Sequence, residues 1–118
     1  SSIDISIYLL PDESIFHIFT ATVCLPAAYL QMKISGHKYL NNLDNLYSQE
    51  FSFWQELISW TYAITPKNLS TNDSLEYIQR MATKGGITES IVNSIKDGNN
   101  IIDAFNNGVN KSIEISKS

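Results

Sequence analysis

The sequence predicts an all-α domain, a bundle of about five to six helices preceded by a short extended arm. Two observations support the helices: apolar residues recur three or four positions apart along most of the chain, and glycine or proline interrupts that pattern where one helix would give way to the next. A third concerns size. The chain has 118 residues, 43% of them hydrophobic, which suffices for one core and is too little for two ordinary domains. We therefore expect one domain over residues 1–118.

The arm is predicted from a short alternating pattern at the N-terminal end. Ile3, Ile5, Ile7 and Leu9 alternate with more polar residues, as in a strand or extended segment with one apolar face. Pro11 ends the pattern.

A first long helix is expected after the arm, with Asp12 as a plausible N-cap and Gly36 at its end. Pro26 falls inside this stretch. Because proline lacks a backbone donor and clashes with the preceding turn, we expect a kink or restart near Cys24 and Leu25.

Residues 39–64 continue the helical spacing and predict one long or broken helix. Its aromatic residues crowd two or more faces, so it must be covered on more than one side. A second subunit is one possible cover, and the core of a monomer is the other. The aromatic residues concerned are Phe51, Phe53, Trp54, Trp60 and Tyr62.

The remainder of the chain predicts a polar loop over 65–73 and three further helices. The first holds the apolar residues between 75 and 81. The second begins with Thr88 as its N-cap and ends at Gly98, and the last covers residues 101–115.

Composition argues against several classes of function. The net charge is −4 and only 17% of residues are charged, so no basic surface is available for nucleic acid. No run reaches the roughly 18 apolar residues of a membrane span, and no signal peptide is recognisable. We expect a cytoplasmic protein that binds neither nucleic acid nor membrane.

Three side chains that often carry chemistry are expected to be structural. Cys24, the single cysteine, lies in an apolar run and cannot form an intrachain disulfide. His17 lies among apolar residues, where a histidine is more often packed and hydrogen-bonded than catalytic, and His37 falls in a turn. Neither histidine has ligand-type neighbours at metal spacing, so no metal is expected.

The segment from Met81 to Ser90 holds the candidate binding site. Gly85-Gly86 lies between two expected helices, where the backbone can approach a ligand closely. The first turn of the following helix offers unpaired N–H groups and a positive dipole end, which suit a carboxylate or phosphate, and Thr88 adds a hydroxyl. Taken alone, this pattern favours a plain helix–helix turn with Thr88 as an ordinary N-cap.

Two stretches resemble pyrroline-5-carboxylate reductases. Thr83-Lys84-Gly85-Gly86-Ile87-Thr88, followed by Gly98 and a closing helix, resembles their substrate loop, which typically reads Ser-Pro-Gly-Gly-Thr-Thr. Phe16-His17-Ile18-Phe19-Thr20-Ala21, followed by Pro26-Ala27-Ala28-Tyr29, resembles the start of their dimerisation domain and its Gly-Pro-Ala-Tyr segment. Order and spacing agree over nearly the whole chain.

This resemblance implies the C-terminal dimerisation and substrate-binding domain of an NAD(P)-dependent oxidoreductase of proline biosynthesis. The implied fold is that of the 6-phosphogluconate dehydrogenase C-terminal domains, with two copies interlocked as a homodimer. NADP or NAD would be bound mainly by a Rossmann domain outside these residues, because the chain has no G-x-G-x-x-G turn. Amides of Gly86, Ile87 and Thr88 and the Thr88 hydroxyl would hold the carboxylate of a cyclic imine, with Gly85 giving it room. No protein residue would be catalytic, since hydride passes from the nicotinamide to the imine carbon.

Departures from the family pattern leave the substrate open. Lys84 replaces a proline, Ile87 replaces a threonine, and Cys24-Leu25 replaces small residues. One alternative is a non-enzymatic helical homodimerisation module whose Gly-Gly turn is purely structural. Another is the helical domain of a different dehydrogenase in the broader 6-phosphogluconate dehydrogenase-like group.

Overall fold

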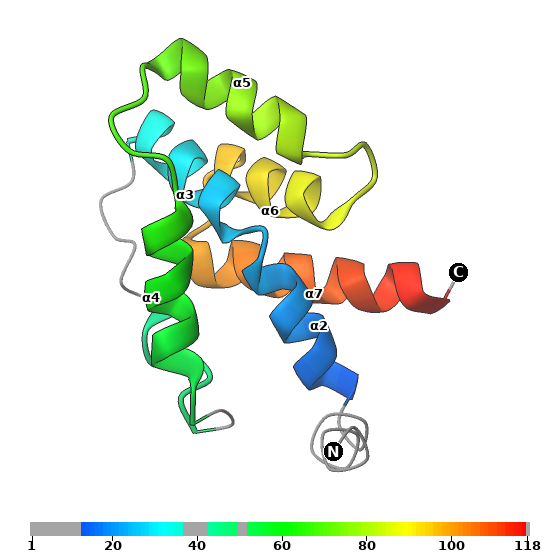
Figure 1. Cartoon of the computed structure of the whole chain (residues 1–118). Coiled ribbons are helices and arrows are strands. Elements are labelled where there is room, and N and C mark those ends of the chain that lie inside the picture. The colour runs from blue at the N-terminus through cyan, green and yellow to red at the C-terminus, as the bar shows by residue number, and fades with distance from the viewer. Residues whose placement is uncertain (1–12, 37–42, 50–51, 118) are drawn as a thin grey trace.

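The computed structural model describes residues 13–36, 43–49 and 52–117, and in these ranges the chain forms six helices and no strand (Figure 1). The helices are α2 (Glu13–Thr22), α3 (Leu25–Ile34), α4 (Trp54–Ile64), α5 (Thr71–Met81), α6 (Ile87–Lys96) and α7 (Ile101–Lys117). The all-α prediction is confirmed. The expected arm over residues 3–9, with Pro11 and Asp12, lies outside the described residues.

The helices are arranged in layers (Figure 1). α6 packs along α7, and α2 lies on the same helix α7. α3 packs against both α5 and α6, which places α5 on the far side of the α3–α6 layer from α7. α4 runs along one end of these layers, where it contacts α3 and α2.

The centre of the core is aromatic. The fully buried ring of Trp54 lies edge-on to Phe105, with ring centroids 6.0 Å apart, and also contacts Tyr47 at 5.2 Å. Its indole N–H donates to the carbonyl of Leu43 over 2.6 Å, so the buried ring keeps its polar group paired. Trp54 therefore joins α4, α7 and the turns before α4 into one core.

The restart predicted at Pro26 is confirmed. α2 ends at Thr22 and α3 begins at Leu25, which places Pro26 in the first turn of α3. The N–H groups in the first turn of a helix have no acceptor within the helix, so proline, which lacks an N–H, loses no helical hydrogen bond there. Gly36 follows the end of α3 with φ +79°, as expected of a glycine that terminates a helix.

The helix expected over residues 39–64 is shorter than predicted. Among the described residues of this stretch, only Trp54–Ile64 is α-helical, and residues 44–49 form turns. The turn segment folds back along the start of α4, where Gln55 Nε2 donates to Asn45 Oδ1 over 3.0 Å. Asn and Ser side chains in this segment compete for backbone groups and favour turns over helix, although the apolar spacing is helical.

Thr88 is not an N-cap, contrary to the prediction. α6 begins at Ile87 with Gly86 in the cap position, so Thr88 lies inside the first turn. Gly98 follows α6 with φ +96°, and α7 occupies the predicted stretch. α5 begins at Thr71, earlier than predicted, because the Ser70 side chain caps it by accepting from the Asp73 N–H, so the polar loop ends before residue 73. No helix in the described ranges is long and apolar enough to cross a membrane.

Candidate functional site

The Gly85-Gly86 turn has a backbone shape that requires its glycines. Gly85 has φ +74°, a left-handed conformation that side chains other than glycine rarely tolerate. The Gly86 amide donates to the carbonyl of Thr83 over 2.8 Å, and a Cβ on Gly86 would lie 3.0 Å from that same oxygen. Glycine is therefore favoured at position 85 by the left-handed backbone and at position 86 by the close Thr83 carbonyl.

The turn presents the N-terminus of α6. At this end of α6, the Ser90 N–H donates to the carbonyl of Gly86 over 3.2 Å. The amides of Ile87, Thr88 and Glu89 precede it and have no carbonyl one turn back within the helix. The four residues predicted to form the site, Gly85, Gly86, Ile87 and Thr88, are thus at one helix end, partly or fully exposed.

One group of the chain already contacts this turn. Glu89 Oε1 accepts a hydrogen bond from the Gly85 N–H over 2.9 Å, which closes a small ring between the turn and the first helical turn. A carboxylate at a helix N-terminus is favoured by the helix dipole. It also places a negative charge beside the amides that an incoming anion would use.

Thr88 lies near the break between α2 and α3, where α6 packs against α3. Burial raises the pKa of the Cys24 thiol above its ordinary 9.0, while the nearby Thr88 hydroxyl opposes that rise. The Cys24 thiol also lies 3.7 Å from the carbonyl of Thr20, to which it donates. The Gly-Gly loop and the Cys24–Pro26 segment, far apart in sequence, therefore meet in the fold.

The chain matches no family model, no curated protein and no solved structure.

His17 and Ser112 form a buried pair away from the loop. His17 Nδ1 lies 2.7 Å from Ser112 Oγ and joins α2 to α7, and each residue is 5% exposed. The expectation that His17 is packed and hydrogen-bonded is confirmed. Although serine and histidine at this distance resemble part of a nucleophilic site, both side chains are buried, which favours a structural role for the pair.

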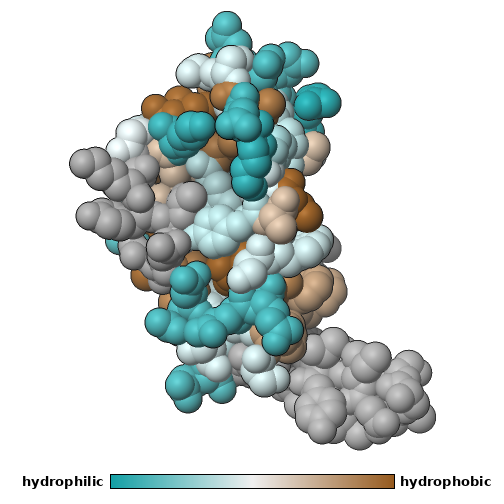
Figure 2. Space-filling view, turned by 60° about the vertical axis from the view of Figure 1, so that its left-hand side comes forward, coloured by the Kyte–Doolittle hydropathy of each residue, from teal (hydrophilic) through white to brown (hydrophobic). Residues whose placement is uncertain are grey.

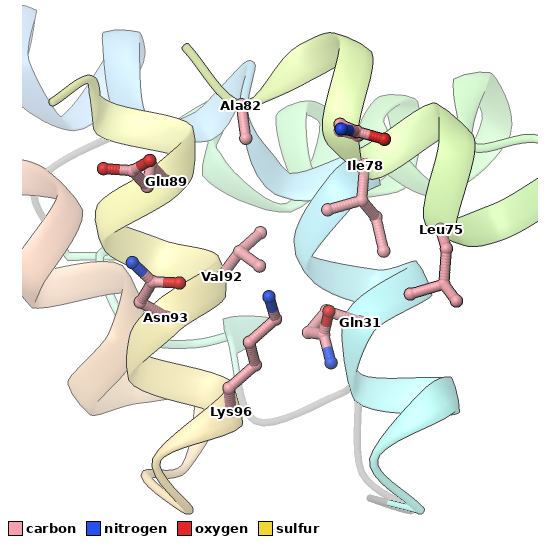
Figure 3. Close-up of a pocket in the computed structure, with 9 residues that line it drawn as sticks. Gln31, Leu75, Ile78, Ala82, Glu89, Val92, Asn93 and Lys96 are labelled. Atoms are coloured by element: carbon pink, nitrogen blue, oxygen red, sulfur yellow. The ribbon is translucent and has the colours of Figure 1, made fainter. Parts of the chain in front are cut away.

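A pocket that sequence analysis did not predict lies between α3, α5 and α6 (Figure 3). Its volume is about 350 Å³, within the range of small-molecule sites. The apolar side chains lining it are Leu75, Ile78, Ala82 and Val92. The polar side chains lining it are Gln31, Gln79, Glu89, Asn93 and Lys96. We call this the α3/α5/α6 pocket.

Gln31 is the unusual member of this set. It is 3% exposed, and its Nε2 donates to Ser35 Oγ over 3.0 Å, whereas its Oε1 is buried without a hydrogen-bond partner. The sequence holds a trace of this site, because a glutamine interrupts the otherwise apolar stretch Leu25–Met32. Nothing in the sequence, however, shows that α5 and α6 place further polar groups opposite it.

No cluster of three or more His, Cys, Asp or Glu side chains suited to a metal ion occurs in the ranges the structure describes.

Proposed function

We propose that this chain is the dimerisation and substrate-binding domain of an NAD(P)-dependent, pyrroline-5-carboxylate reductase-like oxidoreductase. In this proposal the loop from Gly85 to Thr88 holds the carboxylate of a cyclic imine or a related small carboxylate. A cytoplasmic location goes with the same proposal.

The observation that supports it best is that α3 packs against α6, with Thr88 near enough to Cys24 to affect the pKa of its thiol. The two stretches that resemble the reductases, 82–90 and 16–29, are separated by more than fifty residues of sequence. If the likeness of each stretch were accidental, nothing would require them to meet. Their contact instead puts a helix N-terminus, a threonine hydroxyl and the Pro26 break at one place.

The loop could hold a carboxylate through its amides. Ile87 and Thr88 N–H groups point out of the start of α6, where the helix dipole adds positive potential. Gly85, with no side chain, leaves the approach open, since a Cβ built on it would meet nothing within 4 Å. The role of these residues is to bind and orient the substrate.

The nicotinamide cofactor does not fit the residues described here. α6 is preceded by a helix and a Gly-Gly turn rather than by a strand and a three-glycine loop, and Glu89 would repel a pyrophosphate at that helix end. The proposal therefore assigns NADP or NAD to a Rossmann domain outside these residues.

Homodimerisation is the second part of the proposal, and an exposed apolar stripe on α2 supports it. Phe16 and Phe19 on α2, with Val23 in the turn that follows it, recur at helical spacing and are 60%, 46% and 48% exposed. An apolar stripe of this kind on a surface is typical of an interaction site. We assign it to a second copy of the chain because the same stretch resembles the reductases' dimerisation segment.

Carboxylate binding is tested by titrating the ¹⁵N-labelled chain with L-proline, the product expected from reduction of the cyclic imine. We expect amide shifts centred on Gly86, Ile87 and Thr88. Thr88→Val, which keeps the shape and removes the hydroxyl, should weaken binding about tenfold. Thr83→Val removes an exposed hydroxyl from the same loop and should leave binding unchanged. Equal effects of both variants, or no shifts at these amides, would refute the substrate site.

Dimerisation is tested by light scattering at several concentrations. We expect a mass of twice the 13.3 kDa subunit. The double variant Phe16→Ser, Phe19→Ser should be monomeric at concentrations where the parent is dimeric, whereas Met81→Ser, at an exposed apolar residue of α5, should remain dimeric. A parent chain that is monomeric throughout would rule out the homodimer.

A non-enzymatic homodimerisation module is the alternative, and the Glu89–Gly85 bond favours it. With Glu89 accepting from the turn, the Gly-Gly segment is stabilised by the chain itself, as in an ordinary capped helix start. A chain that dimerises but shows no proline-dependent shifts would support this alternative.

A further inference from the structure

The α3/α5/α6 pocket adjoins the Gly-Gly loop, because Glu89 lines the pocket and also accepts from the Gly85 N–H, but none of the residues Gly85 to Thr88 lines it. Its floor is α3, and its walls are α5 and α6 (Figure 3). Leu75 and Ile78 face into it from α5, and Val92 faces into it from α6. It therefore offers an apolar surface to the aliphatic part of a small molecule.

The oxygen of the Gln31 side-chain amide is an acceptor that lacks a hydrogen-bond donor. The amide's nitrogen end is directed toward Ser35, and its oxygen end is directed into the pocket, toward Ile78 and the tip of Lys96 (Figure 3). A buried carbonyl oxygen without a donor is unfavourable, and native proteins nearly always satisfy such atoms with protein, water or ligand. The position opposite Oε1 thus suits a ligand group that donates a hydrogen bond.

The charged residues restrict the ligand further. The Lys96 ammonium extends into the same space, where it would attract a carboxylate. Glu89 balances this charge, so the pocket as a whole is neutral and disfavours a phosphate or a dicarboxylate. A donor, a single carboxylate and an aliphatic group are together the features of a small apolar amino acid.

We propose that the α3/α5/α6 pocket binds a small aliphatic amino acid as its zwitterion. The ligand's ammonium donates to Gln31 Oε1, its carboxylate binds Lys96, and its side chain packs on Ile78, Leu75 and Val92. The amides of Asn93 and Gln79, which also line the pocket, offer further donors to the carboxylate. The pocket's 350 Å³ exceed what a side chain of leucine size requires.

The test is an NMR titration of the full ¹⁵N,¹³C-labelled chain with L-leucine and with two analogues that each lack one charged group. 4-Methylpentanoate has the carboxylate and the alkyl chain, and 3-methylbutylamine has the amine and the alkyl chain. We expect L-leucine to bind with a dissociation constant of about 1 mM or lower and each analogue to bind about tenfold more weakly. Shifts should centre on the Gln31 side-chain amide, the Ile78 methyls and Lys96.

Two variants and a matched control complete the test. Gln31→Met keeps the size of the side chain and removes the acceptor, and Lys96→Met removes the ammonium, so each should weaken leucine binding about tenfold. Lys33→Met makes the same change at an exposed lysine of α3 that does not line the pocket, and it should bind leucine like the parent. Circular dichroism of each variant checks that the helices remain.

Three results would overturn the proposal: no leucine-dependent shifts at these residues, full binding by folded Gln31→Met and Lys96→Met, or equal binding of 4-methylpentanoate. The last would identify a plain carboxylate site. These shifts are distinct from those expected at Ile87 and Thr88 with proline, so this proposal and the proposed function can fail independently.

Discussion

Gly108 of α7 is the position where a single methyl group should have the clearest effect on folding. It is buried where α7 crosses α6, and a Cβ placed on it would lie 2.5 Å from both Cδ1 and Cγ1 of Ile91. Ile91 is itself fully buried, so its side chain has no free space into which to rotate. We predict that Gly108→Ala destabilises the chain.

Two opposing terms determine the size of the effect. Alanine is favoured over glycine inside a helix by about 1 kcal/mol. Overpacking a closed core costs about 1–3 kcal/mol. The free energy of unfolding should therefore fall by roughly 0–2 kcal/mol, with the loss attributable to Ile91.

A double-mutant cycle separates these terms. Ile91→Ala alone should cost about 2–5 kcal/mol because it leaves a cavity. In the Ile91→Ala background, Gly108→Ala should instead be neutral or stabilising, which gives a favourable coupling of about 1 kcal/mol or more.

Urea unfolding followed by tryptophan fluorescence measures each free energy, since buried Trp54 reports on the core. Asn110→Ala, at an exposed position of the same helix, serves as a control that changes helix propensity alone. If Gly108→Ala stabilises the chain as much as Asn110→Ala does, and the cycle is additive, then the close α6–α7 contact at Gly108 is wrong.

Three further predictions follow from buried polar groups. Because burial raises the pKa of Cys24 above 9.0, its thiol should react with a disulfide reagent more slowly than a free cysteine at neutral pH, and its rate should still be rising above pH 9. Rapid reaction at pH 7 would contradict this. Ser112→Ala leaves buried His17 without its partner and should lower the free energy of unfolding by about 1–3 kcal/mol in urea titrations, whereas exposed Ser116→Ala should have little effect. Burial, with the nearby Asp44 carboxylate, raises the pKa of Tyr62 from 10.0 to about 12, so the fold favours the neutral phenol. The stability that this preference contributes should be present below pH 10 and lost as the pH rises toward 12. The melting temperature of Tyr62→Phe should therefore fall less steeply over this range than that of the parent chain.

Much of the fold follows from local chemistry that can be seen in the sequence. Gly36 and Gly98 end helices in left-handed conformations, and Pro26 starts a new helix because it cannot continue the old one. Each of these constraints acts within one helical turn of the residue that imposes it. The grouping of Gly85 through Thr88 at a helix start is equally local, and it was predicted for that reason.

Three features of the fold depend on contacts between residues far apart in sequence, and only the tertiary structure shows them. The Trp54 indole N–H donates to the carbonyl of Leu43 and holds the turns before α4 against the core, a contact that adds to the local preference of their Asn and Ser side chains for turns. Thr88 lies inside the first turn of α6 and near Cys24, because α6 packs against α3. The sequence could not indicate that Gln31 Oε1 is buried without a partner beside α5 and α6. Hydrophobic periodicity shows which residues are buried, but it does not show which polar groups lie next to them.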